Sequence, residues 1–475
     1  MKKILLIIIV TLFSSALLFA QAPRLWMTSS WGGAMNWGTI LKGDSTGTNF
    51  QVMYEFDNTN GAQPMGKLCL ANNGKLYGVT WLGGYGDSCV CFEYDTSTNV
   101  YTKFFDLYQD QTQGYGAQSE MINCSNGFLY GLCPSGGLNL GGVIYKIDPS
   151  ADTYTPVFNF AGQTGITPIG SLSENDNGKL YGMTYQGGAK GCGTIFSYDP
   201  ILNSFSKLFD LDTSTGRSPY FGNLLNASNG LLYGMTYSGG AYDRGVIFSF
   251  NISNNSYTDL FDFDSINGSY PWASLTQADN GLLYGVTSNG GVYDKGVLFS
   301  YDINSSSFLK HYDFDSTHGA NPKRSLTQTS NGLLYGTTKF GGLQNIGVVF
   351  SYNIVTNTYS VVHNFNSTAC YYPDCDILET GARSTPHTTN NISEVNSTEM
   401  KLFPSPASKE ISITGNSISI NDIVTVTDVT GREVLQQKIS QAHQINLNVS
   451  SLAPGVYFAE IKMQKGIVVK RFVKE

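Results

Sequence analysis

The chain has 475 residues, of which only 13% are charged, and its formal net charge is −8 at pH 7. Lys and Arg form no stripe before the C-terminal residues, so the sequence lacks the basic surface that neutralises nucleic-acid phosphates. We therefore expect no nucleic-acid partner.

The first residues have the layout of a secretory signal peptide. Lys2 and Lys3 precede the apolar run 4–13, and a further apolar stretch ends at Ala20. A basic start, a short apolar stretch and a small residue before the cleavage point define such a signal, so we expect residues 1–20 to be removed on export. An uncleaved anchor helix is the alternative. No later window is apolar enough to span a bilayer.

Gly-Gly pairs recur along the chain at intervals of 51 to 53 residues. They are Gly32-Gly33, Gly83-Gly84, Gly136-Gly137, Gly187-Gly188, Gly239-Gly240, Gly290-Gly291 and Gly341-Gly342. A period of about 50 residues is typical of a four-stranded propeller blade, whereas helical repeats are shorter. We therefore predict that residues 21–380 form an all-β, seven-bladed β-propeller of about 51-residue repeats.

The unit that begins at Pro271 indicates how one blade folds. Asn280-Gly281 separates two apolar-rich runs, and Asn-Gly is the strongest short signal for a β-hairpin with a type I′ turn. We expect residues 273–278 and 282–287 to pair, and 296–301 and 308–315 to form the third and fourth strands. The same pair recurs at Asn73-Gly74, Asn126-Gly127, Asn177-Gly178, Asn229-Gly230 and Asn331-Gly332.

An aromatic residue follows each third strand at a constant distance. These residues are Tyr101, Tyr154, Phe205, Tyr257, Phe308 and Tyr359. A large flat side chain at a constant position is suited to packing between neighbouring blades, where it buries about 150–250 Å².

The two ends of the repeat region are incomplete in complementary ways. The first unit opens at Leu25-Trp26 with the pattern of a second strand, and the last first-strand pattern, Pro373 to Leu378, has no hairpin after it. We predict that residues 374–379 return to pair beside 25–29 and close the ring. Closure removes the exposed sheet edges.

These motifs together resemble kelch repeats, as in Tyr94-Asp95, Thr98-Asn99 and Tyr101. The pattern NGxLYGxTxxGGxxxxGxxF is more similar to the GloVer tandem repeat of exported bacterial proteins. The resemblance covers about residues 25–380, and it implies a kelch-like propeller. It implies no activity.

The C-terminal part of the sequence changes character twice. Residues 381–398 are rich in Ser, Thr and Asn without apolar periodicity, and we expect a flexible linker. Residues 399–475 contain short alternating runs separated by turns, which favours a small immunoglobulin-like β-sandwich.

The sequences FPSPA, DVTGREV, LAPGVYFAEI and IVVKRFVKE resemble the C-terminal sorting domain, type A, of the type IX (Por) secretion system. The residues that carry the motif are Pro404, Pro406, Gly431, Gly455, Tyr457 and Lys470. Ser405 stands where the family usually has Asn. The resemblance implies handling by the type IX secretion machinery, removal of the tail, and release or attachment to surface lipopolysaccharide. It places the protein at the outer-membrane surface or outside the cell. A plain immunoglobulin-like module is the alternative.

Acidic pairs at the blade ends invite comparison with calcium loops. They are Glu55/Asp57, Asp210/Asp212, Asp262/Asp264 and Asp313/Asp315, each followed by a glycine. The spacing does not match an EF-hand loop, so we expect these carboxylates to hydrogen-bond their own turns and to protect the outer strands. Because the chain is exported, some of its eight cysteines are candidates for disulfides, with Cys370 and Cys375 the best local pair.

The sequence contains no GxSxG elbow, HExxH or phosphate-binding loop. We therefore assign no catalytic residue, no metal ligand and no cofactor. Trp31, Trp37, Trp81 and Trp272 are candidate ligand-binding residues, since exposed aromatics stack on sugars; packing between blades is the alternative for most of them.

We expect a monomeric, non-enzymatic exported propeller that binds a glycan or a protein through loops on one face. Two alternatives remain open. One is an exported carbohydrate-active enzyme on the same scaffold, and the other is a passive coat protein.

Overall fold

The computed structural model describes residues 22–107, 112–366, 370–373, 375–381, 401–403, 408–414, 423–428, 433–439, 444–463 and 466–474. The chain divides into two compact units, Met1–Thr385 and Pro386–Glu475. Within the described ranges the only helical elements are two short 3-10 turns, η1 (Tyr85–Asp87) and η2 (Gly162–Thr164), and neither could cross a membrane. The expected signal peptide lies outside these ranges.

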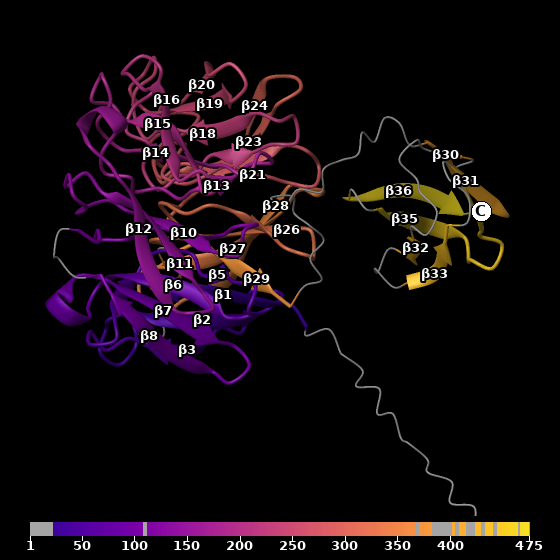
Figure 1. The fold of residues 1–475 in the computed structure, drawn as a ribbon, viewed down its shortest axis with the longest axis horizontal. Helices are drawn as coiled ribbons and strands as arrows, with labels where there is room; N and C mark the ends of the chain where they lie inside the picture. Colours follow the sequence, from indigo (N-terminus) through magenta and orange to yellow (C-terminus); the bar gives the residue numbers. More distant parts are fainter. Residues whose placement is uncertain are drawn as a thin grey trace, which may run out of the picture. The chain divides into compact units, whose positions relative to one another are not determined.

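The first unit consists of seven antiparallel sheets (Figure 1). Blade 1 contains β29 (Leu378–Thr380), β1 (Arg24–Ser29), β2 (Thr39–Asp44) and β3 (Gln51–Glu55). Blade 2 contains β4 (Ala62–Pro64), β5 (Cys69–Leu70), β6 (Leu76–Leu82), β7 (Val90–Asp95) and β8 (Val100–Asp106). Blade 3 contains β9 (Ile122–Asn123), β10 (Leu129–Cys133), β11 (Val143–Asp148) and β12 (Thr153–Asn159). Blade 4 contains β13 (Ser173–Glu174), β14 (Leu180–Thr184), β15 (Thr194–Asp199) and β16 (Ser204–Asp210).

The remaining three blades repeat this order. Blade 5 contains β17 (Leu225–Asn226), β18 (Leu232–Met235), β19 (Val246–Asn251) and β20 (Ser256–Asp262). Blade 6 contains β21 (Thr276–Gln277), β22 (Leu283–Val286), β23 (Val297–Asp302) and β24 (Ser307–Asp313). Blade 7 contains β25 (Thr327–Gln328), β26 (Leu333–Thr338), β27 (Val348–Asn353) and β28 (Thr358–Asn364). The predicted all-β, seven-bladed propeller is confirmed.

The ring closes as predicted, because the last strand of the propeller pairs with the first. β29 is antiparallel to β1, with Leu378 opposite Trp26. Trp26 Nε1 also donates a hydrogen bond to Thr380 Oγ1 at 2.9 Å. In Figure 1 the orange β29 accordingly lies beside the indigo β1. Blade 1 is therefore built from both ends of the propeller sequence.

Each Asn-Gly hairpin forms where it is expected, but its predicted turn type is wrong. In blade 6 the N–H of Gly281 donates to Ala278 O at 2.8 Å, and only Gly281 has a positive φ, of 82°. This is a type I turn followed by a left-handed glycine, a three-residue hairpin loop. Asn280 acts through its side chain, since its Nδ2 donates to Tyr284 Oη at 3.0 Å and its Oδ1 accepts from Leu282 N.

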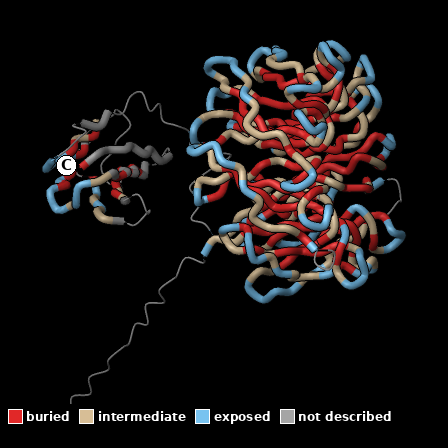
Figure 2. The backbone as a smooth tube through the Cα atoms, turned by 180° about the vertical axis from the view of Figure 1, so that it is seen from behind, coloured by how far each residue is buried: buried red, intermediate tan, exposed pale blue. Residues whose placement is uncertain are grey.

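The glycine of each LYG motif is required by an aromatic ring on the neighbouring strand. Gly285 pairs with Phe299, and a Cβ added to Gly285 would lie 2.5 Å from the ring. A side chain at this position would displace the ring, so the motif couples the second strand to the third. Buried residues fill the space between the sheets, while exposed residues lie in the loops (Figure 2).

The predicted aromatic wedges are confirmed. Each ring packs against an aromatic on the fourth strand of the preceding blade, as Phe205 does with Phe158 at a centroid distance of 3.9 Å and an angle of 2°. The other pairs are Tyr54–Tyr101, Phe105–Tyr154, Phe209–Tyr257, Phe261–Phe308 and Tyr312–Tyr359. Where the wedge is Tyr, its hydroxyl also donates to a carbonyl of the preceding loop, for example Tyr359 to His318 O at 2.7 Å.

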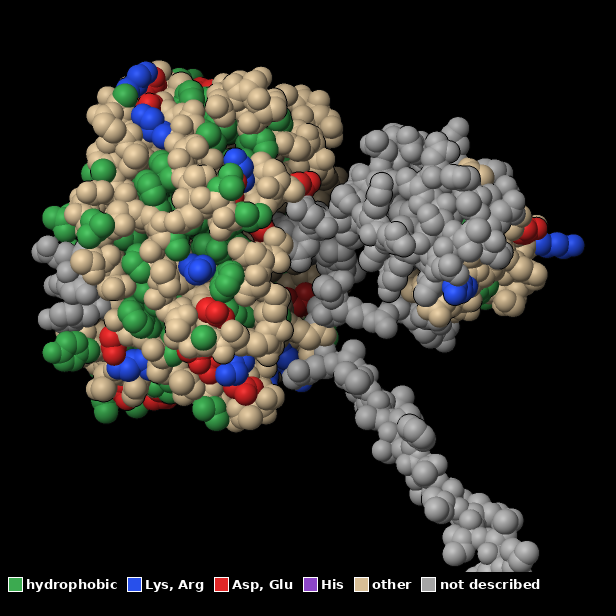
Figure 3. Space-filling view, in the orientation of Figure 1, with side chains coloured by type: hydrophobic (Ala, Val, Ile, Leu, Met, Phe, Trp, Pro, Cys, Tyr) green, Lys and Arg blue, Asp and Glu red, His purple; other side chains and the backbone are tan. Residues whose placement is uncertain are grey.

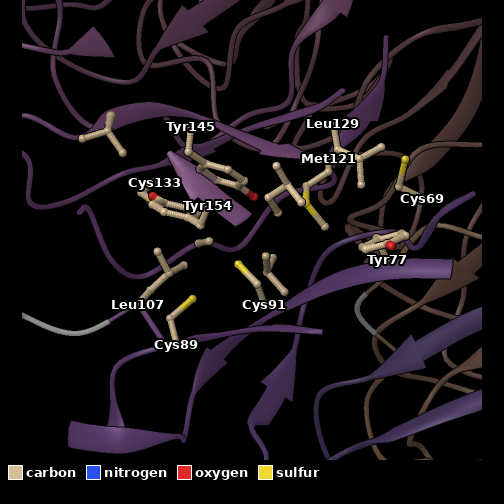
Figure 4. Packing of buried hydrophobic residues seen from close by; sticks show 14 of the residues in the cluster. Cys69, Tyr77, Cys89, Cys91, Leu107, Met121, Leu129, Cys133, Tyr145 and Tyr154 are labelled. Atoms are coloured by element: carbon tan, nitrogen blue, oxygen red, sulfur yellow. The ribbon is translucent and has the colours of Figure 1, made fainter. Parts of the chain in front are cut away.

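Blades 2 and 3 meet in a cluster that contains several cysteines (Figure 4). Cys89, Cys91 and Cys133 are fully buried there beside Tyr145 and Tyr154. All eight cysteines are free, so the suggested Cys370–Cys375 disulfide is wrong. The Cys375 thiol instead donates to Thr28 O at 2.6 Å, and burial raises its pKa to about 12.

Replacing Tyr145 by Phe should stabilise the propeller. Tyr145 stands where the other full repeats have Phe, and among the described residues its buried hydroxyl has no hydrogen-bond partner. An unsatisfied buried hydroxyl costs roughly 1–3 kcal/mol, so we expect Tyr145→Phe to raise the free energy of unfolding by about 1 kcal/mol in urea titrations.

Tyr154→Phe is the matched control for this prediction. The Tyr154 hydroxyl lies in the same cluster but donates to Gln113 O at 2.5 Å, so its removal should lower the stability. A loss of stability in Tyr145→Phe would contradict the prediction.

The described residues of the second unit form two antiparallel sheets. One is formed by β30 (Lys401–Phe403), β31 (Glu410–Thr414) and β34 (Gln444–Asn448), and the other by β33 (Glu433–Lys438), β32 (Ile423–Asp428), β35 (Gly455–Met463) and β36 (Gly466–Lys474). One core joins them, with Ile411, Val426, Leu447 and Ile461 among its fully buried residues. This is the expected small β-sandwich.

Candidate ligand-binding face

Two kinds of loop meet at the same edge of every blade. One follows the second strand and contains the Gly-Gly pair; the other, here called the interblade segment, leads from one blade into the first strand of the next. In blade 6 they are joined by a β-bridge between Ser269 and Asn289. Tyr270 N, in the same segment, also donates to Arg244 O in the Gly-Gly loop of blade 5, at 2.9 Å. We call this side of the propeller the Gly-Gly face.

The first strands of successive blades contact one another. Asn223 N donates to Ser274 Oγ at 2.7 Å, and Ser274 N donates to Ser325 Oγ at 3.0 Å. These strands therefore lie innermost, around the axis. The interblade segments that precede them therefore surround the axis on the Gly-Gly face.

The acidic pairs bind the turns on this face, as expected. Asp262 accepts from Ala241 N at 2.6 Å, just after a Gly-Gly pair, and Asp264 accepts from Ile266 N and Asn267 N. Asp210/Asp212 and Asp313/Asp315 make equivalent bonds. Within the described ranges no group of three His, Cys, Asp or Glu side chains is arranged to hold a metal ion.

An aromatic cluster lies near the axis on the Gly-Gly face of blades 4 to 6. Its members are Tyr185, Tyr220, Phe221, Tyr237, Tyr270 and Trp272. Trp272 contacts Tyr220 at a centroid distance of 4.5 Å and Tyr237 at 5.7 Å. All members except Phe221 are half-buried, so the cluster combines a packed base with accessible ring surface.

The cluster is assembled from two repeat positions. Tyr185 and Tyr237 follow the second strands of blades 4 and 5, whereas Tyr220 and Trp272 follow the prolines of interblade segments. Burial raises the pKa of Tyr237, with smaller contributions from Tyr270 and Tyr185, so its hydroxyl stays protonated at neutral pH. The protonated phenol remains able to donate a hydrogen bond.

Tyr270 has a φ of 55°, a conformation that costs an L-residue about 1–2 kcal/mol. The equivalent residues of five other blades share it: Gln63, Thr167, Ser218, Asn321 and Tyr372. This conformation therefore belongs to the repeat itself and does not mark the cluster as a strained site.

Basic residues adjoin the cluster and stack on aromatic rings. Lys323 Nζ lies 3.7 Å from the Trp272 ring centroid, and Arg324 Cζ lies 4.3 Å from that of Phe221. Deeper along the axis, Lys67 Nζ lies 4.0 Å from Glu120 Oε2. Burial raises the pKa of Glu120, Lys67 and Arg324 oppose this rise, and Asp376 adds to it.

The structure places the four candidate tryptophans on the Gly-Gly face but does not bring them together. Trp31 and Trp37 lie in blade 1 and Trp81 in blade 2. Of the four candidates, only Trp272 takes part in ring–ring contacts among the described residues. Trp37 packs between blades 1 and 2, which is the alternative that the sequence left open. Sequence reasoning missed the tyrosines, although the repeated Pro-aromatic pattern of Tyr220 and Trp272 was a usable signal.

Blade 5 differs from other blades in its outer strand. Blades 2, 4 and 6 have a lysine three residues before an aspartate, and the two form an ion pair, as Lys310 and Asp313 do at 2.9 Å. Blade 5 has Asp259 at the lysine position, facing Asp262. Burial and then Asp262 raise the pKa of Asp259 to about 6.

Asp259 should therefore weaken the fold at neutral pH. Its folded pKa lies above the unfolded value, so the cost is present above about pH 6 and disappears as the pH falls toward 4. We expect Asp259→Asn to stabilise the chain at pH 7 by about 0.5–1 kcal/mol, a figure reduced because Asp259 is only partly shielded from solvent, which screens its charge. Urea midpoints of the parent chain and of Asp259→Asn should differ most at pH 7 and converge as the pH is lowered to 5.5 and then to 4. A constant difference would count against this interpretation.

The chain matches known families over most of its length. Residues 13–227 and 174–398 match the Gloeobacter/Verrucomicrobia repeat, and residues 401–475 match the secretion system C-terminal sorting domain. The chain belongs to the Gloeobacter/Verrucomicrobia repeat family and carries a type IX sorting tail. It is exported by that system to the cell surface or the extracellular space. The resemblance of the repeats to kelch repeats remains a prediction from the sequence.

Similar solved structures share the propeller. A candidate 6-phosphogluconolactonase of Bacteroides uniformis is 15% identical, with a TM-score of 0.54 over 75% of this chain and 99% of that one. The periplasmic gluconolactonase PpgL of Pseudomonas aeruginosa is 13% identical, with a TM-score of 0.50 and the same two coverages. At these identities the similarity shows the fold alone.

PorZ, a surface component of the type IX secretion system of Porphyromonas gingivalis, is 15% identical with a TM-score of 0.44. The match covers 92% of this chain, which spans 63% of the length of the PorZ structure. No curated protein matches the chain.

Only some of the predicted sorting residues can be placed. Gly455 begins β35, and the buried Tyr457 donates through its hydroxyl to Ala453 O at 2.9 Å. Lys470 lies in β36 opposite Ala459. Pro404, Pro406 and Gly431 lie outside the described residues.

Proposed function

We propose that this protein is an exported, non-enzymatic binding propeller and that its ligand is a glycan held on the Gly-Gly face. The observation that carries the proposal is the aromatic cluster around Trp272, a set of half-buried rings near the propeller axis on the Gly-Gly face. Rings of this kind offer apolar area to sugar faces, and the tyrosine hydroxyls offer hydrogen bonds.

The uncharged character of the surface is compatible with this function. The visible face of the propeller in Figure 3 consists mostly of backbone and uncharged polar side chains with scattered hydrophobic ones, and charged side chains are sparse. Loops on a rigid scaffold are where binding residues normally stand, and the cluster is built from such loops. The sorting tail brings the propeller to the cell exterior, where polysaccharides are encountered.

A glycan array with the mature full chain, residues 21–475, tests the proposal. We expect saturable binding to at least one polysaccharide and no product in a hydrolysis screen on the same sugars. Tyr237→Ala should weaken the binding by about tenfold or more, because stacking on one aromatic contributes on the order of 1 kcal/mol or more.

Tyr293→Ala is the matched control. Tyr293 is 58% exposed in a Gly-Gly loop of blade 6 and is absent from the cluster, so its loss should leave binding unchanged. Binding without any sugar dependence, for example to a protein alone, would overturn the glycan proposal. Released product would favour the carbohydrate-active enzyme instead.

A further inference from the structure

A second group of aromatic rings lies on the Gly-Gly face, in blades 7 and 1. Tyr372 contacts Tyr371 at a centroid distance of 4.2 Å and Phe340 at 5.0 Å. All three side chains are half-buried, as most members of the aromatic cluster are. Trp31, which is 37% exposed, adjoins them through a β-bridge with Tyr371. We call Phe340, Tyr371 and Tyr372 the second aromatic cluster.

The second aromatic cluster is built from the same loops of the repeat as the aromatic cluster around Trp272. Tyr372 and Tyr270 each precede the proline of an interblade segment, and both have a positive φ, of 57° and 55°. Phe340 directly precedes a Gly-Gly pair, in the loop that carries Tyr237 in blade 5. Because equivalent loops of all blades lie at the same edge, both groups of rings lie near the axis on one face.

Hydrogen bonds connect the two groups of rings across blades 6 and 7. Ser288 Oγ donates to Tyr270 O at 2.9 Å, and Asn321 Nδ2 donates to Ser288 O at 2.8 Å. Lys339 N donates to Asn321 O at 3.4 Å, and Phe340 is the next residue along the chain. Each bond joins an interblade segment to a Gly-Gly loop. The rings of blades 7 and 1 are therefore held in a fixed position relative to those of blades 4 to 6.

The separation of the two groups sets the size of the ligand that can contact both. Sheets that pack face to face lie about 10 Å apart and converge toward the axis of a ring, so Tyr270 and Tyr372, two blades apart, are separated by roughly 15 Å. This distance is greater than that between the terminal rings of a trisaccharide. A short sugar can therefore stack on one group only, whereas a longer chain reaches both.

We infer that the Gly-Gly face binds an extended polysaccharide chain at two subsites, one on the aromatic cluster and the other on the second aromatic cluster. This inference rests on the proposed glycan-binding function and narrows its ligand class to polymers. Once a chain is held at one subsite, its contact with the other is intramolecular and adds affinity that a short sugar does not gain.

Calorimetric titration of the mature full chain with oligosaccharides of two lengths tests this inference. The probes are the trisaccharide and the nonasaccharide of the polysaccharide that binds best on the array, and the amylose, laminarin and xylan series are titrated in every case. We expect the nonasaccharide to bind at least about fiftyfold more tightly than the trisaccharide. The larger number of binding registers on the longer chain accounts by itself for less than about tenfold.

The variants Tyr372→Asn and Phe340→Asn each remove one ring of the second aromatic cluster. They insert the residue that another blade has at the equivalent position, Asn321 and Asn289, and Asn321 has the same positive φ as Tyr372. Each variant should weaken nonasaccharide binding by about fivefold or more and leave trisaccharide binding unchanged. Tyr237→Ala should weaken the binding of both lengths. A single cooperative urea transition shows that each variant is folded.

Tyr293→Ala again serves as the matched control, because it removes an exposed ring of the same face that belongs to neither group. It should leave the affinities for both lengths unchanged. A difference between the two lengths of less than about tenfold would overturn the inference and leave the proposed glycan binding intact.

Full nonasaccharide affinity in both Asn variants would likewise contradict the second subsite. Weaker trisaccharide binding in those variants would indicate one undivided site and would also contradict it. Failure of every glycan to bind would overturn the proposed function itself, so the two failures are distinguishable.

Discussion

Deleting residues 370–380 should lower the free energy of unfolding by at least about 5 kcal/mol, since three buried side chains are lost at about 2 kcal/mol each. Cys370, Cys375 and Ile377 are 0%, 0% and 1% exposed. The deletion also removes β29, leaving the β1 edge unpaired and prone to association. Calorimetry should show a much lower melting temperature, and a dye for apolar surface should bind.

Two further variants make this test specific. Ile377→Ala keeps the strand and should cost about 2–4 kcal/mol. Deletion of 384–394, of equal length but outside the propeller strands, should leave the propeller transition in place. A cooperative melt unchanged by the 370–380 deletion would contradict closure by β29.

Removal of one aromatic wedge should have the next largest effect. Phe308 stacks on Phe261 of the preceding blade at 4.0 Å and 2°, and it also contacts Phe263 and Phe299. Phe308→Ala should lower the free energy of unfolding by about 3 kcal/mol, because a cavity opens between blades 5 and 6. Urea titration of the full chain measures this loss.

Leu309→Ala provides the control for the wedge. Leu309 is the next residue on β24 but is 58% exposed, so its truncation should change stability by about 0.5 kcal/mol or less. Equal midpoints for the two variants would show that the wedge does not hold the blades together.

The architecture was predictable because it is encoded at positions that repeat. The Gly-Gly pairs occur in all seven blades, and the Asn-Gly hairpins and the listed wedge aromatics occur in blades 2 to 7; such recurrence separates these signals from chance. Closure was predictable for a related reason, since Leu25-Trp26 has the pattern of a second strand without a first. The turn type was not, because Asn280 acts through its side chain where a positive φ was expected.

The candidate site was less predictable because it uses positions whose residue type changes between blades. Tyr220, Tyr237 and Trp272 are far apart in sequence, and only the ring geometry brings them into contact. Attention to tryptophan alone found one member of the cluster and three residues outside it. The free state of Cys375 also depends on a tertiary contact, with Thr28 O.

The position of β29 in the chain has a consequence for biogenesis. The segment that completes the ring is synthesised after every other strand of the propeller and before the sorting tail at residues 401–475. A polypeptide terminated early, anywhere before residue 378, thus lacks both the means to finish its first sheet and the address for crossing the outer membrane. The order of these segments along the polypeptide therefore keeps unfinished propellers from reaching the cell exterior.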